Sequence, residues 1–486
     1  MDLLSKTIKK LSDEEYQALL AEVSGKKKNK PYIVLETSRM GQVDDGEMME
    51  LLQVNPSTYY TLKSRLNSKI AAILAKKVNN PISVLLSEVI RVPANLYGSN
   101  REFSIRALKE LEKQLIQYDL SGELIVVYKT LAQLNLYNED YNKYELLYKK
   151  HVAFSLGVSK VERLFYEFIR QIGNFRLTKD ESDKNKLSEI LDELSNFCEL
   201  YDSHRMFVFY NIANIYYLCI VEENEEVLKS KEIEIENVLK EMSNIFDKYN
   251  LDTFYQNIKF LTDFLLFEYY TKTKNHIRAE HYLEKINPEI DAICPQHISH
   301  FYVVEFLNAK VEKFLTDGSV DRLVELNSRI EENIDIDMAE TYHYIAYKKF
   351  KAISKFYQKD FSGAARIINE MRNELSMKKY LFTDIECKLF QALQYCIMGE
   401  DGLCTQLISS LKRQIKPSEE QYTSAKLFIK FLKTALKPAE YRRKIKKVNE
   451  QWLEFAQANT GEHAILPFLK LDEGLIRRIT NPIKDN

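Results

Sequence analysis

Glycine and proline are so scarce in this chain that folds rich in tight turns are excluded. Only 13 Gly and 10 Pro occur among 486 residues, whereas the two together make up roughly 12% of an average protein. No glycine lies between Gly173 and Gly318, and no proline lies between Pro93 and Pro288. Because β-hairpins, phosphate-binding loops and nucleophile elbows need these residues, the sequence argues against all-β folds and the common mononucleotide-binding enzymes.

From about residue 83 onward, apolar residues recur with the spacing of amphipathic helices, separated by breaks of only two to six residues. We aligned the second helix of each expected hairpin on the position where a small or apolar residue follows a short polar turn. The separations are 43, 48, 44, 44, 41 and 40 residues. The sequence therefore predicts an all-α fold of repeated two-helix units. The aligned positions are Tyr144, Leu187, Ile235, Ala279, Leu323, Ala364 and Cys404.

One of these units carries a recognisable turn. Residues 357–364 read Y-Q-K-D-F-S-G-A and resemble the turn of a tetratricopeptide repeat, in which an aromatic and a small residue pack the second helix against the first. The resemblance implies an α-solenoid of tetratricopeptide-like helical hairpins over residues 81–486, preceded by a small helical N-terminal domain over residues 1–80. A non-repetitive helical bundle is the alternative, but single cores rarely grow beyond ~300 residues.

Residues 1–80 contain a helix-turn-helix pattern. Residues 44–54 read as a short helix that ends in a tight turn, and Asn55 and Pro56 begin a long helix as its N-cap and first residue. Gln53 occupies the turn position where such motifs usually carry glycine, so a left-handed conformation is expected there at some cost. The pattern resembles the DNA-binding domains of sigma factors and response regulators. The expected packing residues of the short helix and the turn are Met48, Leu51, Leu52 and Val54.

That resemblance makes residues 56–65 the recognition helix. Five basic and no acidic residues lie between positions 60 and 77, in a chain whose formal net charge is −2. A basic patch of this kind would neutralise phosphates and make binding depend on salt. The competing interpretation is a capping or oligomerisation domain whose lysines are simply solvated. The candidate DNA contacts are Ser57, Thr58, Tyr60 and Thr61 at base edges, with Lys63, Arg65 and Lys69 at phosphates.

Catalytic and metal-binding patterns do not emerge from the sequence. Cys294, His297 and His300 are three residues apart, but no fourth ligand is evident, so a helix start is expected there rather than a zinc site. No set of serine, cysteine and histidine suggests a catalytic triad, and we expect no enzyme activity and no cofactor. The six cysteines lack C-x-x-C spacing and lie in apolar stretches, which predicts reduced thiols and a cytoplasmic location. No segment is long and apolar enough to span a membrane.

Aromatic residues are abundant, with 30 Tyr and 25 Phe, and most should fill the space between hairpins. A sharper hypothesis is that the first helices of the units line a groove, where asparagine side chains clamp an extended peptide. The candidate groove residues are Asn211, Asn214, Tyr217, Asn257, Lys259 and Tyr302.

The sequence thus predicts a non-enzymatic interaction protein that binds a peptide or protein partner through a helical-repeat groove. Residues 1–80, called the head from here on, are a candidate domain for duplex DNA, which would make the protein a transcriptional regulator. The layout is similar to that of bacterial regulators that sense peptide pheromones. A pure protein–protein scaffold or assembly module with no nucleic-acid role is the alternative.

Overall fold

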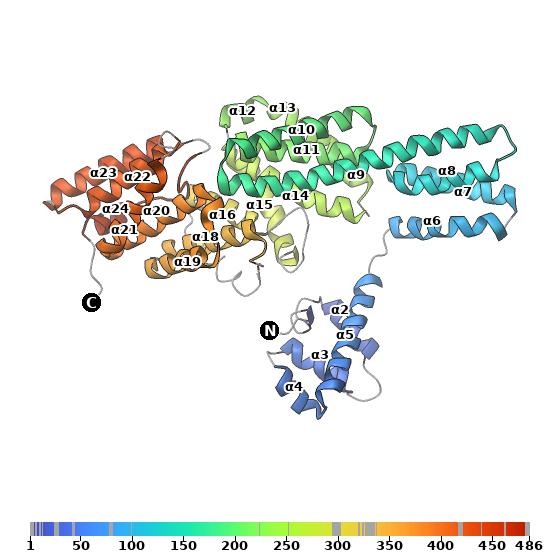
Figure 1. The fold of residues 1–486 in the computed structure, drawn as a ribbon, viewed down its shortest axis with the longest axis horizontal. Helices are drawn as coiled ribbons and strands as arrows, with labels where there is room; N and C mark the ends of the chain where they lie inside the picture. Colours follow the sequence, from blue (N-terminus) through green and yellow to red (C-terminus); the bar gives the residue numbers. More distant parts are fainter. Residues whose placement is uncertain are drawn as a thin grey trace. The chain divides into compact units, whose positions relative to one another are not determined.

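The structure, a computed structural model, contains helices and no strands among the residues that it describes (Figure 1). The all-α class predicted from the sequence is therefore confirmed. The described residues are those of 1–486 other than 1–3, 5–6, 9–10, 12, 24–28, 41–43, 77–80, 99, 223, 251, 294–302, 319–320, 323–324, 326–335, 337, 417–420, 439, 461–462 and 482–486. Within this set, no helix combines the length and the apolar character needed to cross a membrane.

The chain divides into two compact units. The first comprises residues 1–118 and 126–144, and the second comprises residues 119–125 and 145–486. Two helices have residues in both units, namely α8 (Ser121–Leu134) and the 39-residue α9 (Asp140–Thr178).

Within the first unit, a cluster of buried apolar side chains joins the helices up to residue 70. Its members include Leu19, Leu35, Leu52, Leu66 and Ile70. The guanidinium of Arg39 donates hydrogen bonds to the carbonyls of Ile8 and Leu11, at 2.8 and 2.7 Å. The helices of this unit are α2 (Asp13–Val23), α3 (Lys30–Met40), α4 (Asp45–Leu52), α5 (Pro56–Lys76), α6 (Pro81–Gly98) and α7 (Arg101–Gln117).

The second unit is a series of helices in which neighbours along the chain pack in pairs: α10 with α11, α14 with α15, α18 with α19, α20 with α21, and α22 with α23. Its helices after α9 are α10 (Glu181–Leu200), α11 (His204–Tyr217), the π-helix η1 (Leu218–Glu222), α12 (Glu225–Ser230), α13 (Glu232–Lys248), α14 (Thr253–Lys272), α15 (His276–Ile293), α16 (Val303–Asp317), α18 (Thr341–Tyr357), α19 (Phe361–Glu374), the 3-10 helix η2 (Met377–Lys379), α20 (Leu381–Met398), α21 (Asp401–Ile415), α22 (Thr423–Leu436), α23 (Tyr441–Ala458) and α24 (Glu473–Thr480).

Three of these pairs are joined by the same left-handed turn. Lys274, Lys359 and Gly399 have φ angles of 60°, 65° and 77°, and each lies two residues before the next helix. In every case the N–H of the following residue donates to the carbonyl five positions earlier, at 2.9–3.0 Å. This is the hydrogen bond of a Schellman motif, which satisfies carbonyls that the helix leaves open.

The register found by aligning the sequence fits these turns. Of the seven aligned positions, six are buried, and Leu323 lies outside the described residues. Three of them follow the left-handed residue by five positions: Ala279, Ala364 and Cys404. A small side chain there lets the second helix approach the first closely, because nothing larger fits between two packed helices without displacing one of them.

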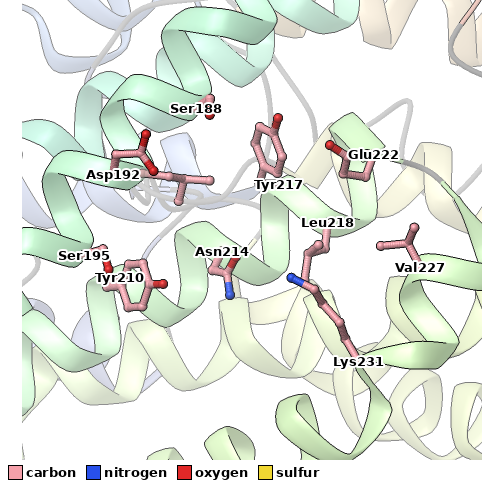
Figure 2. A pocket seen from close by; sticks show the side chains of 11 residues that line it. Ser188, Asp192, Ser195, Tyr210, Asn214, Tyr217, Leu218, Glu222, Val227 and Lys231 are labelled. Atoms are coloured by element: carbon pink, nitrogen blue, oxygen red, sulfur yellow. The ribbon is translucent and has the colours of Figure 1, made fainter.

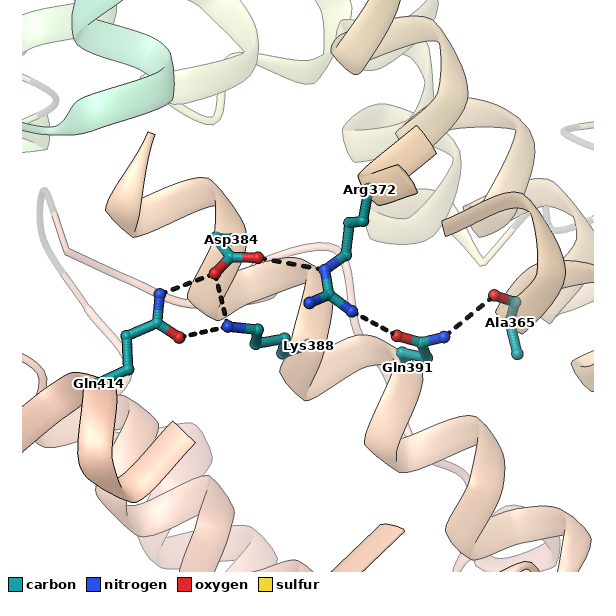
Figure 3. A network of polar contacts seen from close by, with 6 residues as sticks. All are labelled: Ala365, Arg372, Asp384, Lys388, Gln391 and Gln414. Carbon is teal, nitrogen blue, oxygen red and sulfur yellow. Dashed lines mark hydrogen bonds and ion pairs between the residues drawn. The ribbon is translucent and has the colours of Figure 1, made fainter. Parts of the chain in front are cut away.

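A buried polar network holds α19, α20 and α21 together (Figure 3). The carboxylate of Asp384 accepts hydrogen bonds from Arg372 at 3.1 Å, from Lys388 at 2.6 Å and from Gln414 at 2.7 Å. Arg372 also donates to Gln391 at 3.0 Å. Burial opposes the charged form of the carboxylate, but the hydrogen bonds from Lys388 and Gln414 outweigh it, and the pKa of Asp384 is lowered. The Asp384 carboxylate therefore keeps its negative charge, and the hydrogen bond that it accepts from Gln414 ties α21 to α20.

Candidate functional site

The helix-turn-helix pattern forms two consecutive helices, α4 and α5, with a three-residue connection. Asp44 and Glu47 form a capping box at the start of α4. Gln53 closes α4 in the left-handed conformation, with φ 51° and ψ 56°, as predicted. The Asn55 side chain accepts a hydrogen bond from the N–H of Thr58 at 2.8 Å, which confirms its capping role. Local sequence alone therefore accounts for where both helices begin and end.

One packing prediction in this motif is wrong. Met48 and Leu52 are buried and Val54 packs against them, but the Leu51 side chain is 56% exposed. Met48 and Leu52 are four positions apart and share one helix face, which is enough to fill the contact of an eight-residue helix. Leu51 lies at the edge of that face and stays in solvent.

Lys63 is engaged within the head. Its ammonium donates to both carboxylate oxygens of Asp45 at 3.0 Å, and its side chain is only 12% exposed. The hydroxyl of Tyr59 donates to the same carboxylate at 3.0 Å. Burial works against ionisation of Asp45, but these hydrogen bonds prevail and its pKa is lowered. Lys63 thus ties α5 to α4, and a phosphate contact would have to compete with this ion pair.

The other candidate DNA contacts are distributed unevenly over α5. Ser57, Thr58, Thr61 and Arg65 are exposed, and Tyr60 is 53% exposed, so these five side chains are accessible to solvent. By contrast, Lys69 is half-buried and donates to the carbonyl of Glu22 at 3.2 Å. The surface that the structure offers to a ligand is therefore mainly hydroxyl groups and one guanidinium.

The predicted groove residues Asn214 and Tyr217 line a pocket of about 340 Å³ between α10, α11 and η1 (Figure 2). Two helix faces meet there, and each presents polar side chains with the spacing i, i+4, i+7, which keeps them on one side of a helix. The polar lining consists of Ser188, Asp192 and Ser195 on α10, Tyr210, Asn214 and Tyr217 on α11, Glu222 on η1, and Lys231 just before α13.

Sequence reasoning missed the contribution of α10 to this pocket. The repeated spacing of Ser188, Asp192 and Ser195 was available in the sequence, but only the packing of α10 on α11 shows that it faces Asn214. The π-helix was also unforeseen. Single-turn π segments often occur at functional sites, and Glu222 at the end of this one lines the pocket.

The remaining groove candidates lie elsewhere. Asn211 is buried, and its side-chain amide donates to the carbonyl of Phe207 at 2.8 Å. Asn257 and Lys259 are exposed on α14 and do not line the pocket. Tyr302 lies outside the described residues, as do Cys294, His297 and His300. Elsewhere in the described chain, no cluster of three or more His, Cys, Asp and Glu could hold a metal ion.

The buried side of α11 is anchored by charges. The Tyr216 hydroxyl donates to Glu305, and the guanidinium of Arg176 lies 3.9 Å from both Glu305 and Glu268 and donates to the Tyr342 hydroxyl at 2.9 Å. Burial disfavours the charge of Arg176, but the surrounding Tyr342, Glu305 and Glu268 raise its pKa. The hydrogen bond from Tyr216 to Glu305 ties α11 to α16 in the core.

Comparisons with known proteins add nothing to this geometry. No protein-family model, curated protein or solved structure matches the chain.

Proposed function

We propose that this protein is a non-enzymatic interaction protein, and that the pocket between α10, α11 and η1 binds an extended segment of a peptide or protein partner. The observation that carries the proposal is the position of Asn214 between Tyr210 and Tyr217 on the pocket face of α11. A carboxamide has both donors and an acceptor, so it can pair with a peptide C=O and N–H at once.

The dimensions fit a short stretch of peptide. Tyr210 and Tyr217 are seven residues apart, which corresponds to about 10 Å along the helix and to about three residues of an extended chain. Their rings can cover the peptide backbone on either side of Asn214 while their hydroxyls stay in water. The volume of about 340 Å³ lies at the lower end of the range for ligand pockets.

The charge of the pocket lining favours a peptide segment that is basic. The pocket lining includes the carboxylates of Asp192 and Glu222 against one ammonium, that of Lys231. Residues 222–241, which follow directly, carry eight acidic and three basic side chains. A peptide with Lys or Arg beside its clamped backbone would therefore be favoured over an acidic one.

Selection of peptides from a random display library on the full chain tests this proposal. The selected peptides should be rich in basic residues, and Asn214→Ala should weaken their binding by about 5- to 100-fold through the loss of two hydrogen bonds. Asn257→Ala is the matched control, since it removes an exposed asparagine outside the pocket. Failure to select any peptide, or equal binding to Asn214→Ala and to the unmodified protein, would leave the scaffold interpretation in its place.

We further propose that the hairpins of the second unit stack as a tetratricopeptide-like solenoid. The recurring left-handed turn, followed five positions later by a buried small residue, supports this arrangement. The free thiols of Cys198, Cys219, Cys387, Cys396 and Cys404 support the cytoplasmic location predicted from the sequence.

A second candidate function is DNA binding by the head. The observation in its favour is the open surface of α5, where Ser57, Thr58, Tyr60 and Thr61 occupy the first turns, followed by Arg65. Side chains at the first turns of a recognition helix are those that reach base edges. Arg65→Gln should weaken binding of the full chain to duplex DNA, whereas Lys69→Gln should have a smaller effect because Lys69 is held by Glu22. Equal DNA binding by both variants and the unmodified chain would contradict the proposal that the head binds DNA.

A further inference from the structure

A second pocket, of about 700 Å³, lies among α21, α22 and α23, and lysine dominates its lining. Three lysines come from α22, namely Lys426, Lys430 and Lys433, and Lys437 is the residue at which this helix ends. The spacing i, i+4, i+7 of the three helical lysines keeps them on one face of the helix, over a length of about 10 Å.

Neighbouring helices complete the basic lining. Lys412 and Lys416 come from the end of α21, and Lys447 comes from α23. The apolar side chains of the lining are Ile415 and Ile429, and the methylene stems of the lysines supply further apolar surface. The pocket therefore combines a concentration of ammonium groups with the apolar stems that carry them.

The wall of the pocket is held in place before any ligand arrives. Gln414, which lies between Lys412 and Lys416 in the sequence, is bonded to Asp384 in the network of Figure 3. Gln451 on α23 also lines the pocket.

Positive charge is concentrated far beyond the average of the chain. Residues 405–449 contain 12 basic and three acidic residues, although the formal net charge of the whole protein is −2. Lys430 has a partner in Glu454 at 2.8 Å. Contact with the Lys412 ammonium, together with burial and the charge of Lys437, lowers the pKa of Lys433. The ammonium groups thus repel one another in the free protein, and a bound polyanion would relieve that repulsion.

We propose that this lysine pocket binds the phosphate backbone of a nucleic acid strand. A stripe of about 10 Å spans about three phosphates of one strand at a rise of 3.4 Å per phosphate, and the lysines of the neighbouring elements widen it. Seven lysines exceed what the few charges of a single nucleotide can neutralise, so a polymer satisfies the site better than a small ligand. The absence of arginine and aromatic side chains from the lining residues means that neither bidentate base recognition nor base stacking is available, so binding is independent of sequence.

An acidic polypeptide is the main competitor for such a surface. Carboxylates are best recognised by the planar fork of arginine, whereas lysine acts as a point charge suited to phosphate oxygens. The pocket lining therefore favours phosphates, and the experiment must compare the two polyanions directly.

The test measures binding of the full chain to a labelled 20-nucleotide DNA strand, and to its duplex, at several salt concentrations. The double variant Lys433→Gln/Lys437→Gln should weaken binding by about tenfold at moderate salt and reduce the slope of log K against log salt by about 1.5 to 2. Lys378→Gln/Lys379→Gln, which removes two exposed lysines elsewhere in the second unit, should bind as the unmodified protein does. Circular dichroism should show equal helix content in all variants.

Three results would overturn the inference: no binding of either DNA at low salt, binding unaffected by Lys433→Gln/Lys437→Gln, or competition by polyglutamate of equal charge as effective as unlabelled DNA. The variant Arg65→Gln separates DNA binding by the head from DNA binding by the lysine pocket. If Arg65→Gln abolishes binding while Lys433→Gln/Lys437→Gln does not, the head binds DNA and the lysine pocket does not. Peptide selection should be unchanged in Arg65→Gln and in Lys433→Gln/Lys437→Gln, because neither variant alters a residue of the pocket that contains Asn214. The peptide site and the lysine pocket are therefore tested separately.

Discussion

The recurring left-handed turn makes a quantitative prediction, because it carries lysine in two of its three copies and glycine in the third. Lys359 and Gly399 have φ angles of 65° and 77°, and each begins the same hydrogen-bonded connection to the next helix. The Lys359 side chain is exposed. An L-residue in this conformation costs about 1–2 kcal/mol, whereas the flexibility of glycine in the unfolded chain costs about 0.5–1 kcal/mol.

Exchanging the two residue types should therefore change stability in opposite directions. Lys359→Gly should stabilise the second unit by about 0.5–1 kcal/mol, and Gly399→Lys should destabilise it by a similar amount. Differential scanning calorimetry should show midpoint shifts of about 1–3 °C, upward for Lys359→Gly and downward for Gly399→Lys.

Gly402→Ala is the control that separates the effect of the left-handed backbone from the effect of replacing a glycine as such. Gly402 lies in α21 at an ordinary φ, and an added Cβ would meet nothing within 4 Å. Alanine should be tolerated or slightly stabilising there. If Lys359→Gly and Gly399→Lys move the midpoint in the same direction, or if Gly399→Lys leaves it unchanged, the two turns are not energetically equivalent and the repeat interpretation loses its support.

Other contacts give predictions that unfolding experiments can check. Asp384→Asn should lower the free energy of unfolding by about 2–4 kcal/mol, because it leaves buried cations without their counter-ion. Since the folded pKa of Asp384 lies below its ordinary value, its contribution is present above about pH 4 and is lost as the pH falls through the folded pKa, so acid titration of Asp384→Asn should be shallower. Arg176→Met should cost about 3–5 kcal/mol by leaving two buried carboxylates together, which chemical denaturation would show. Lys63→Ala should lower the stability of the head by up to about 1 kcal/mol, whereas Arg65→Ala should not change it, as proteolysis rates of the two variants would reveal.

How far the sequence could predict this structure depends on the range of the interactions involved. The ends of α4 and α5 follow from neighbours in the chain, since Asn55 caps the helix that it precedes and Gln53 must turn left-handed. The buried positions Ala364 and Cys404 follow from periodicity. By contrast, the partner of Lys63 lies 18 residues away in sequence, so its ion pair could not be read from helix spacing alone.

The candidate sites show the same limit. Asn214 could be identified as a pocket residue because it shares a helix face with Tyr217, but Asn211 has the same residue type, lies three positions earlier and is buried. Which asparagine faces solvent is decided by the helices packed around α11. The polar face of α10 was visible in the sequence, but its role depended on a contact that pattern alone could not supply.

The distribution of charge explains why composition gave no indication of the lysine pocket. A formal net charge of −2 excludes a long-range field that would draw nucleic acid to the whole protein. The net charge says little about a single binding site, because at physiological salt the interaction between two exposed charges decays over about 8 Å. A ligand in the lysine pocket is in contact with a lining whose described residues include seven lysines and no carboxylate. A nearly neutral chain can therefore bind a basic peptide at one pocket and a polyanion at another, provided that each charge cluster lies at its own site.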